Sequence, residues 1–95
     1  MTNLILTAYC WCHACTGHDH QPTASGRRPV VGVTIAAPRS VPLGTRVALY
    51  VPGWGVVQRR VDDRTHRRYE GRWDVFVRSH REAREFGLRT ATRIQ

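Results

Sequence analysis

Short β-favouring runs, each ended by proline, glycine or small polar residues, are the feature that most restricts how this chain can fold. The runs cover residues 4–9, 30–36, 46–51, 55–63, 73–77 and 88–94. Proline and glycine lie in the connections at 40–45 and 52–55, as turns between strands require. The last run alternates between two faces, which is the period of a strand. The pattern predicts a mainly β fold with six strands.

A single short helix is expected after the fifth run. Ser79 and Glu82 have the spacing of a capping box, with Ser79 as the N-cap. Gly87 supplies a C-terminal stop, and Ala83 and Phe86 would form the buried face. Six strands and one short helix are the elements of a small closed barrel. A length of 95 residues corresponds to one domain, residues 1–95.

The charge of the chain is strongly positive. The formal net charge is +8, and every one of the 15 basic residues is arginine. Arginine pairs bidentately with carboxylates and phosphates, so nucleic acid, teichoic acid or the acidic groups of a cell-wall polymer would each fit as a partner. A solvated basic face without a partner is the alternative. Nucleic acid is disfavoured because the arginines are spread along the chain without a recognisable nucleic-acid motif.

The sequence carries no run long enough to cross a membrane. Residues 1–7 lack the positive region and the apolar length of a signal peptide. We therefore expect a protein that is made in the cytoplasm without an export signal of its own and has no membrane partner. We also expect it to be a monomer.

Three cysteines fall within six positions, at Cys10, Cys12 and Cys15. Three histidines lie close by, and a zinc site could be drawn from the cysteines and one of His13, His18 and His20. The spacing is not a standard zinc-knuckle spacing, and no second Cys/His pair occurs downstream. One disulfide with a spare thiol, or three reduced thiols, is therefore favoured, and no metal is expected.

Two aspartates lie within strand-like runs, Asp63 and, eleven positions later, Asp74. A carboxylate in such a position costs free energy unless it is paired or used. Asp74 is flanked by Trp73, Val75 and Phe76, and apolar surroundings of this kind raise the pKa of a carboxyl group, as a general acid requires. Both aspartates are candidates for catalysis.

Neighbouring Asp62 is expected to differ from Asp63. In a regular strand Val57, Arg59, Val61 and Asp63 share one face and Asp62 points the other way. We therefore interpret Asp62 as a surface carboxylate or one paired with an arginine.

Several short motifs, in order, resemble one family. They are Thr-Ala-Tyr-Cys at 7–10, Thr-Ala-Ser-Gly at 23–26, Val-Pro-Leu-Gly-Thr at 41–45, Val-Pro-Gly-Trp-Gly at 51–55, the segment 61–76 and the helix ending at 87. Together they resemble the 3D-domain family, which is named for three aspartates and is related to the MltA-type lytic transglycosylases. The resemblance covers nearly the whole chain and implies a double-psi β-barrel.

The chain departs from the family pattern at two places. The glycine-rich loop that follows the first aspartate in the family is a basic segment here, Arg-Thr-His-Arg-Arg-Tyr-Glu-Gly at 64–71. Arginines in place of glycines would narrow the approach to the backbone or repel a ligand. Ala37 occupies the place of the third aspartate. The resemblance therefore carries over Asp63 and Asp74 alone.

The resemblance implies cleavage of the β-1,4 bond between N-acetylmuramic acid and N-acetylglucosamine in peptidoglycan. Asp74 would be the general acid and then the base, while Asp63 would hold the hydrogen-bond network or keep Asp74 protonated through like-charge repulsion. The muramic acid's own 6-hydroxyl would close a 1,6-anhydro ring. No cofactor is implied. Since we expect no export signal, the wall would be reached after release, as for a phage-encoded protein.

Further residues are candidate contacts to a glycan. These are Tyr9, Thr23, Ser25, Trp54 and Arg72, with Trp73 as a second candidate for stacking on a sugar ring. Core packing is favoured over stacking for Trp73 and is an equal alternative for Trp54. Structural roles stay open for Asp74, as a cap of barrel amides, and for Asp63, as a salt-bridge partner. The alternative function is a non-catalytic, expansin-like module that binds cell-wall polysaccharide.

Overall fold

The computed structural model describes residues 1–12, 22–69 and 71–95, and its elements follow the expected order. They are β1 (Thr2–Tyr9), β2 (Thr34–Ala37), β3 (Arg46–Val51), β4 (Gly55–Arg64), the 3-10 turn η1 (Arg67–Tyr69), β5 (Arg72–Phe76), α2 (His80–Phe86) and β6 (Arg89–Arg93). Within these ranges, no helix is long and apolar enough to span a bilayer.

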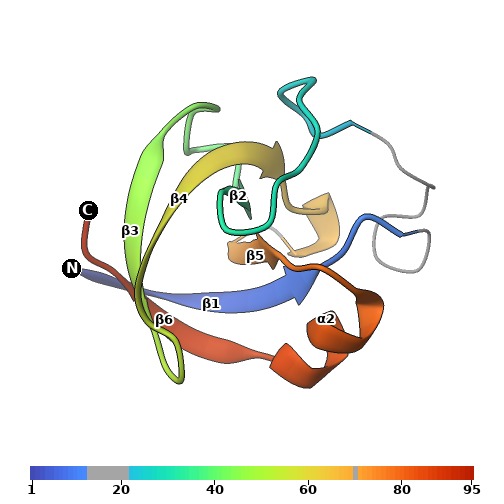
Figure 1. Cartoon of the computed structure of the whole chain (residues 1–95). Helices are drawn as coiled ribbons and strands as arrows, with labels where there is room; N and C mark the ends of the chain where they lie inside the picture. Colours follow the sequence, from blue (N-terminus) through green and yellow to red (C-terminus); the bar gives the residue numbers. More distant parts are fainter. Residues whose placement is uncertain (13–21, 70) are drawn as a thin grey trace.

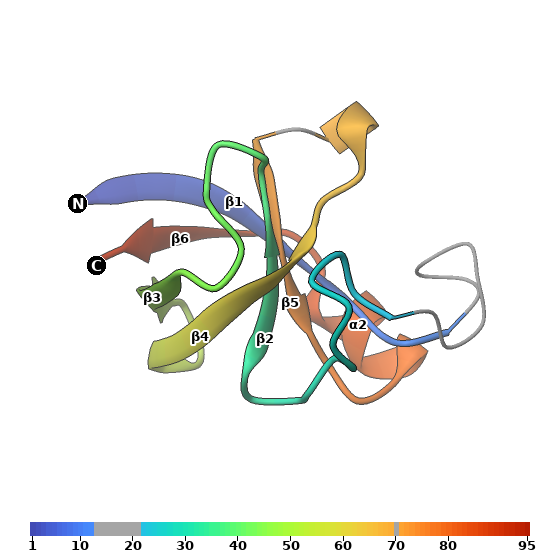
Figure 2. The ribbon, with the colours of Figure 1, turned by 90° about the horizontal axis from the view of Figure 1, so that it is seen from above.

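The six strands close into a barrel in the order β1-β5-β2-β4-β3-β6 (Figure 1). Two neighbouring pairs are parallel, β1 with β5 and β2 with β4, and the other four are antiparallel. The predicted fold class is confirmed: the described residues are mainly β, and they form a closed six-stranded barrel with one short α-helix. The two parallel pairs are compatible with a double-psi arrangement. Both ribbon views place the chain termini together at one end, and α2 towards the other (Figures 1 and 2).

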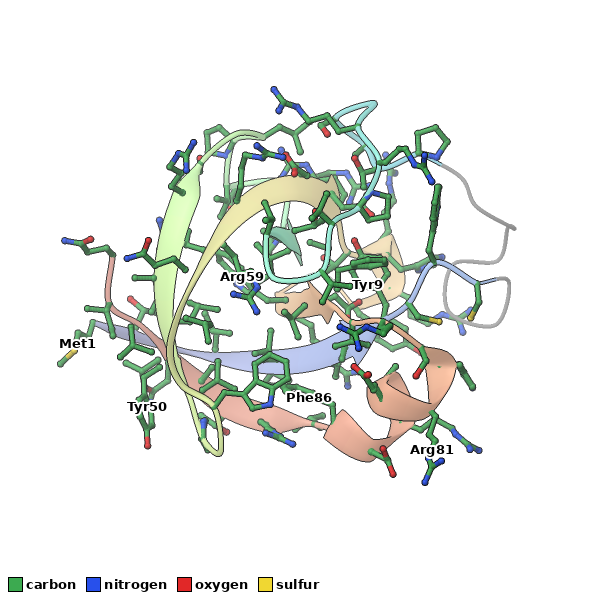
Figure 3. The ribbon with its side chains drawn as sticks, in the orientation of Figure 1. Met1, Tyr9, Tyr50, Arg59, Arg81 and Phe86 are labelled. Carbon is green, nitrogen blue, oxygen red and sulfur yellow. The ribbon has the colours of Figure 1, made fainter. Side chains whose placement is uncertain are left out.

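The barrel encloses an apolar core formed by alternate side chains of every strand. Its fully buried members include Leu6, Ile35, Leu49, Val61 and Val75. The alternation of strands predicts this inward set. Inward-facing Arg59 lies within the ring of strands in Figure 3, as its position between Val57 and Val61 predicts.

A second, smaller apolar cluster lies outside this core. It consists of Tyr9, Ala36 and Phe76, with half-buried Trp11 packed against it. These residues alternate with inward-facing neighbours on β1, β2 and β5, so the cluster covers the outer face of the barrel. The candidate site lies on the same outer face of the barrel as this cluster.

The predicted second strand is wrong in its first half. Residues 31–33 form a turn and the strand begins at Thr34. Gly32 has a φ of 85°, a conformation that favours glycine, and the amides of Val33 and Thr34 both donate to the carbonyl of Val30. The apolar run at 30–36 predicted a longer strand because it does not register this local turn.

The predicted helix limits are confirmed. Ser79 is the N-cap, and its Oγ accepts a hydrogen bond from the amide of Glu82 at 3.1 Å. Gly87 is the C-cap with a φ of 67°. Ala83 and Phe86 are the buried residues of the helix, which contacts β1.

Candidate functional site

The two predicted aspartates lie on opposite sides of the same small residue. Ala36 of β2 is the register partner of Asp74 on β5 and of Asp63 on β4. On the other side of Asp74, its register partner on β1 is Thr7. The four residues Thr7, Asp74, Ala36 and Asp63 therefore form one row across four strands, which we call the acid row. Because neighbouring strands are about 4.8 Å apart, the Cα atoms of the two aspartates are separated by about 10 Å.

A bulge in β4 places Asp63 in this row. The pairing of β2 with β4 runs from Ile35–Val61 to Ala36–Asp63 and skips Asp62. An extra residue of this kind reverses the alternation of faces beyond it. Val61 packs in the inner core, whereas Asp63 lies beside outward-facing Ala36. The prediction that Asp63 shares a face with Val61 is therefore wrong, because it assumed an unbroken strand.

Asp74 is a largely buried carboxyl group with one short hydrogen bond. The Thr7 hydroxyl donates to its Oδ1 at 2.5 Å. Burial raises the pKa of Asp74 above its usual range, and the negative charge of Asp63 raises it further. The hydrogen bond from Thr7 and the positive charge of Arg72 act in the opposite direction. The net effect raises the pKa of Asp74, which is the direction that a general acid needs.

Asp63 accepts hydrogen bonds from three directions. Its Oδ1 accepts from the amides of Ala24 and Arg64 at 3.0 and 2.9 Å, and its Oδ2 accepts from the Tyr9 hydroxyl at 3.0 Å. Burial raises the pKa of Tyr9, and the charge of Asp63 adds to this effect, so Tyr9 stays a neutral donor. These three hydrogen bonds hold the Asp63 side chain in one orientation. The two aspartates therefore lie in different environments, Asp74 largely buried beside one hydroxyl donor and Asp63 held by three donors.

The predicted contacts Thr23 and Ser25 lie in a tight turn next to Asp63. The Thr23 and Ser25 hydroxyls are 2.9 Å apart, and Thr23 donates to the carbonyl of Arg27 at 2.8 Å. The amide of Ser25 donates to the carbonyl of Asp62. With Ala24 bound to Asp63, this turn brings both predicted contacts to the acid row. Thr23 is buried, so half-buried Ser25 is the more accessible of the two hydroxyls.

Asp62 has a structural role. Its side chain is 1% exposed, and both carboxylate oxygens accept from Nε of Arg60 at 2.9 Å. The prediction of an arginine partner is confirmed, and the alternative of a surface carboxylate is wrong. The bulge turns this side chain into the protein, where only a paired charge is tolerated.

Arg64, the first residue of the basic segment after Asp63, is bound to backbone carbonyls of a barrel connection. The Arg64 guanidinium donates to the carbonyls of Pro38 and Val41 at 3.0 and 2.5 Å, so it fastens the 38–45 connection. Arg72 stacks over the Tyr69 ring at 4.7 Å. Arg72 lies two residues before Asp74 on the same strand and contributes positive charge to it, which fits its predicted place at the site.

Of the two tryptophans considered for stacking on a sugar, Trp73 is buried and Trp54 is exposed, but both contact other side chains of the protein. Trp54 contacts the ring of Phe86 at 4.9 Å, and Arg89 lies over its face. Trp54 precedes β4 whereas Asp63 is near its other end, and a ten-residue strand extends up to about 30 Å. The structure does not bring Trp54 to the acid row. Trp73 is buried in the core, beneath Arg93, as its favoured interpretation predicted.

We expect Trp54→Ala to lower the free energy of unfolding by about 1–2 kcal/mol, because it removes an aromatic pair and its buried area. Any activity of the acid row should be unchanged. Denaturant unfolding and an activity assay on the same sample would measure both. Tyr50→Ala is the matched control, since Tyr50 points away from the barrel (Figure 3) and should change stability by less than about 0.5 kcal/mol. Loss of activity in Trp54→Ala with unchanged stability would contradict this assignment.

A surface hollow of about 690 Å³ begins next to the acid row. Phe76, two residues after Asp74 on the same face of β5, lines it together with Trp11, Arg28 and Arg78. Arg28 stacks on the Trp11 ring at 5.0 Å. Aromatic faces and guanidinium groups are suitable contacts for a sugar polymer that carries acidic groups.

Sequence reasoning missed Thr7 and Ala36 as members of the site. Thr7 and Tyr9 share one face of β1, and this spacing was a usable signal. Ala36 had none, because its importance comes from being small and lying between two acids on other strands. The cysteine-rich segment also borders this region, with Cys10 directly after Tyr9. Cys15, His13, His18 and His20 lie outside the described residues.

Comparison with known proteins does not assign the chain to a family. No family model matches the sequence, and no curated protein resembles it closely enough to be counted as a relative. Any functional assignment therefore rests on the residues and geometry of the acid row.

Proposed function

We propose that the protein cleaves the glycan strands of peptidoglycan by lytic transglycosylation, with Asp74 as general acid and base. The observation that carries the proposal is the acid row, which presents two carboxyl groups in different environments on one outer face of the barrel. Two carboxyl groups of this kind are a usual basis for assigning acid and base roles. The motif resemblance to the 3D-domain family supports the same activity.

The reaction begins with protonation of the glycosidic oxygen by Asp74. As the bond to C1 of N-acetylmuramic acid breaks, the 6-hydroxyl of the same sugar attacks C1, and its proton passes to the Asp74 carboxylate. The 1,6-anhydro ring forms and the acid is regenerated without consuming water. A second carboxylate base, as hydrolytic glycosidases use, is not needed. Asp63 acts through its charge and through the hydrogen bonds with which it holds Tyr9 and the 22–27 turn.

The missing third aspartate does not remove a group from the acid row. Ala37 is fully buried and belongs to the inner core, so its side chain points away from the face that carries Ala36. An acid at this position would lie on the other side of β2. Arg64 is the first residue of the altered segment, and its guanidinium group is hydrogen-bonded to the carbonyls of Pro38 and Val41. The row is therefore compatible with catalysis despite both departures.

The proposal is tested by incubating the protein with purified peptidoglycan and analysing the soluble products by mass spectrometry. Muropeptides with 1,6-anhydro ends, lighter by one water than hydrolysed ones, are the expected result. Hydrolysed ends would indicate a hydrolase instead. No products, together with pelleting of the protein with cell walls, would overturn the catalytic proposal and favour the polysaccharide-binding module.

We expect two substitutions to shift the pH profile in opposite directions. Since the general acid must be protonated, kcat/KM should fall as the pH rises through the pKa of Asp74. Thr7→Val removes a hydrogen bond that stabilises the carboxylate, so the pKa should rise and the falling limb should move to higher pH. Asp63→Asn removes a negative charge, so the limb should move to lower pH. Shifts in the same direction would contradict the assignment of Asp74 as the titrating acid.

A further inference from the structure

Two cysteines and a histidine from distant parts of the chain meet at the end of β1. One ligand atom each from Cys10, Cys12 and His80 lies within 4.8 Å of the others. Cys10 Sγ donates to Cys12 Sγ at 2.7 Å, and Cys12 Sγ lies 4.0 Å from Nδ1 of His80. The cluster borders the same hollow as Phe76 and Trp11.

The barrel topology creates this meeting point. Strands β1 and β5 are parallel, and their pairing ends with Tyr9 beside Phe76. The amide of Val77 then donates to the carbonyl of Tyr9 at 2.8 Å. The segments that follow β1 and β5 therefore leave the barrel side by side. The first contains the cysteines, and the second leads into α2, whose first residue is His80. His80 follows Cys12 by 68 residues, so their proximity is a property of the fold.

The donors define the class of ligand. Two thiolates and an imidazole are soft or borderline ligands that select Zn²⁺ over Mg²⁺ or Ca²⁺. In a tetrahedral site with Zn–S bonds of about 2.3 Å, two sulfur atoms lie about 3.8 Å apart. The separation of 2.7 Å between Cys10 Sγ and Cys12 Sγ is below this spacing, and the separation of 4.0 Å between Cys12 Sγ and His80 Nδ1 is above it. Side-chain rotations that move these atoms by about 1 Å therefore suffice to admit the ion. Deprotonation of the two thiols on binding removes the hydrogen atom between them.

We propose that Cys10, Cys12 and His80 bind one Zn²⁺ ion that joins the end of β1 to the start of α2. Three protein ligands leave a fourth position for water or another donor. None of the three ligands belongs to the acid row. A metal bound to the folded state alone stabilises the fold by mass action, so Zn²⁺ is expected to raise the melting temperature.

The test uses the full chain, reduced and freed of metal by a chelator, and titrated with Co²⁺ and then Zn²⁺. We expect one ion per chain, a thiolate-to-Co²⁺ charge-transfer band, the strong visible bands of tetrahedral Co²⁺, and loss of both when Zn²⁺ displaces it. Loss of an outer partner of a metal ligand costs about 10–100-fold in affinity. Loss of a ligand itself should therefore cost more than about 100-fold in Cys10→Ser, Cys12→Ser and His80→Ala.

His66→Ala is the matched control, because His66 is exposed and lies outside the cluster. It should bind Zn²⁺ and gain thermal stability as the unchanged protein does. His80 is also exposed, so His80→Ala should fold and remains informative if a cysteine variant does not. Wild-type affinity in His80→Ala, or no Co²⁺–thiolate band in the reduced protein, would overturn the proposal.

Discussion

Asp74→Asn is expected to lower the rate of anhydro-muropeptide formation by about 10²–10⁴-fold, the usual contribution of a general acid. Asparagine keeps the size of the side chain and can still accept the Thr7 hydroxyl at Oδ1, but it has no proton to transfer. The measurement is the initial rate of product release from purified peptidoglycan. Undiminished cleavage by this variant would remove Asp74 from the mechanism.

The same substitution should make the protein more stable at pH values above the folded-state pKa of Asp74. Since the folded-state pKa of Asp74 is raised, its contribution to stability is fully present below the unfolded pKa. That contribution is lost as the pH rises through the folded pKa. Above the folded-state pKa the wild type therefore carries an unfavourable buried charge that asparagine lacks. Thermal unfolding at pH values above and below this pKa should show a gain that disappears on acidification, which separates lost chemistry from lost folding.

In contrast to Asp74→Asn, Asp62→Ala is expected to lower the stability of the fold strongly. The substitution removes a buried carboxylate that makes charge-assisted hydrogen bonds to Arg60 at 2.9 Å, which corresponds to about 2–3 kcal/mol. For a domain of this size, about 4–8 °C per kcal/mol gives a fall in melting temperature of about 10–20 °C. Thermal unfolding followed by circular dichroism measures the change.

Glu85→Ala is the matched control for a broken ion pair. Glu85 pairs with Arg81 on α2 at 3.5 Å, and both side chains are exposed. Pairs of this kind contribute about 0–1 kcal/mol and are screened by salt. Equal effects of the two substitutions would show that Asp62 has no special structural role.

Much of the fold could be read from local patterns. Strand alternation predicted that Val57, Arg59 and Val61 share one face, and helix-capping rules predicted the limits of α2 at Ser79 and Gly87. These features depend on interactions within a few residues, so the sequence carries them directly. The start of β2 was wrong because a glycine turn at Gly32 interrupts an apolar run that has no other mark of a boundary.

The site divides in the same way. Apolar neighbours on its own strand were enough to indicate Asp74 as an acid with a raised pKa. The face of Asp63 was predicted wrongly, because a bulge in β4 interrupts the regular alternation and turns the side chain outwards. Trp54 was a candidate glycan contact, but in the structure it packs against Phe86, which lies in a different element.

Local sequence order could establish the number and type of elements, one acid flanked by apolar residues, and three cysteines close together in the chain. The closed barrel then placed Thr7, Ala36 and Asp63 around Asp74, and His80 beside Cys10 and Cys12. Such contacts join residues on different strands, and their register depends on the packing of the whole core and on a single bulge. The pair of aspartates is thus visible in the sequence, but the reason that they face the same way is a property of the assembled barrel.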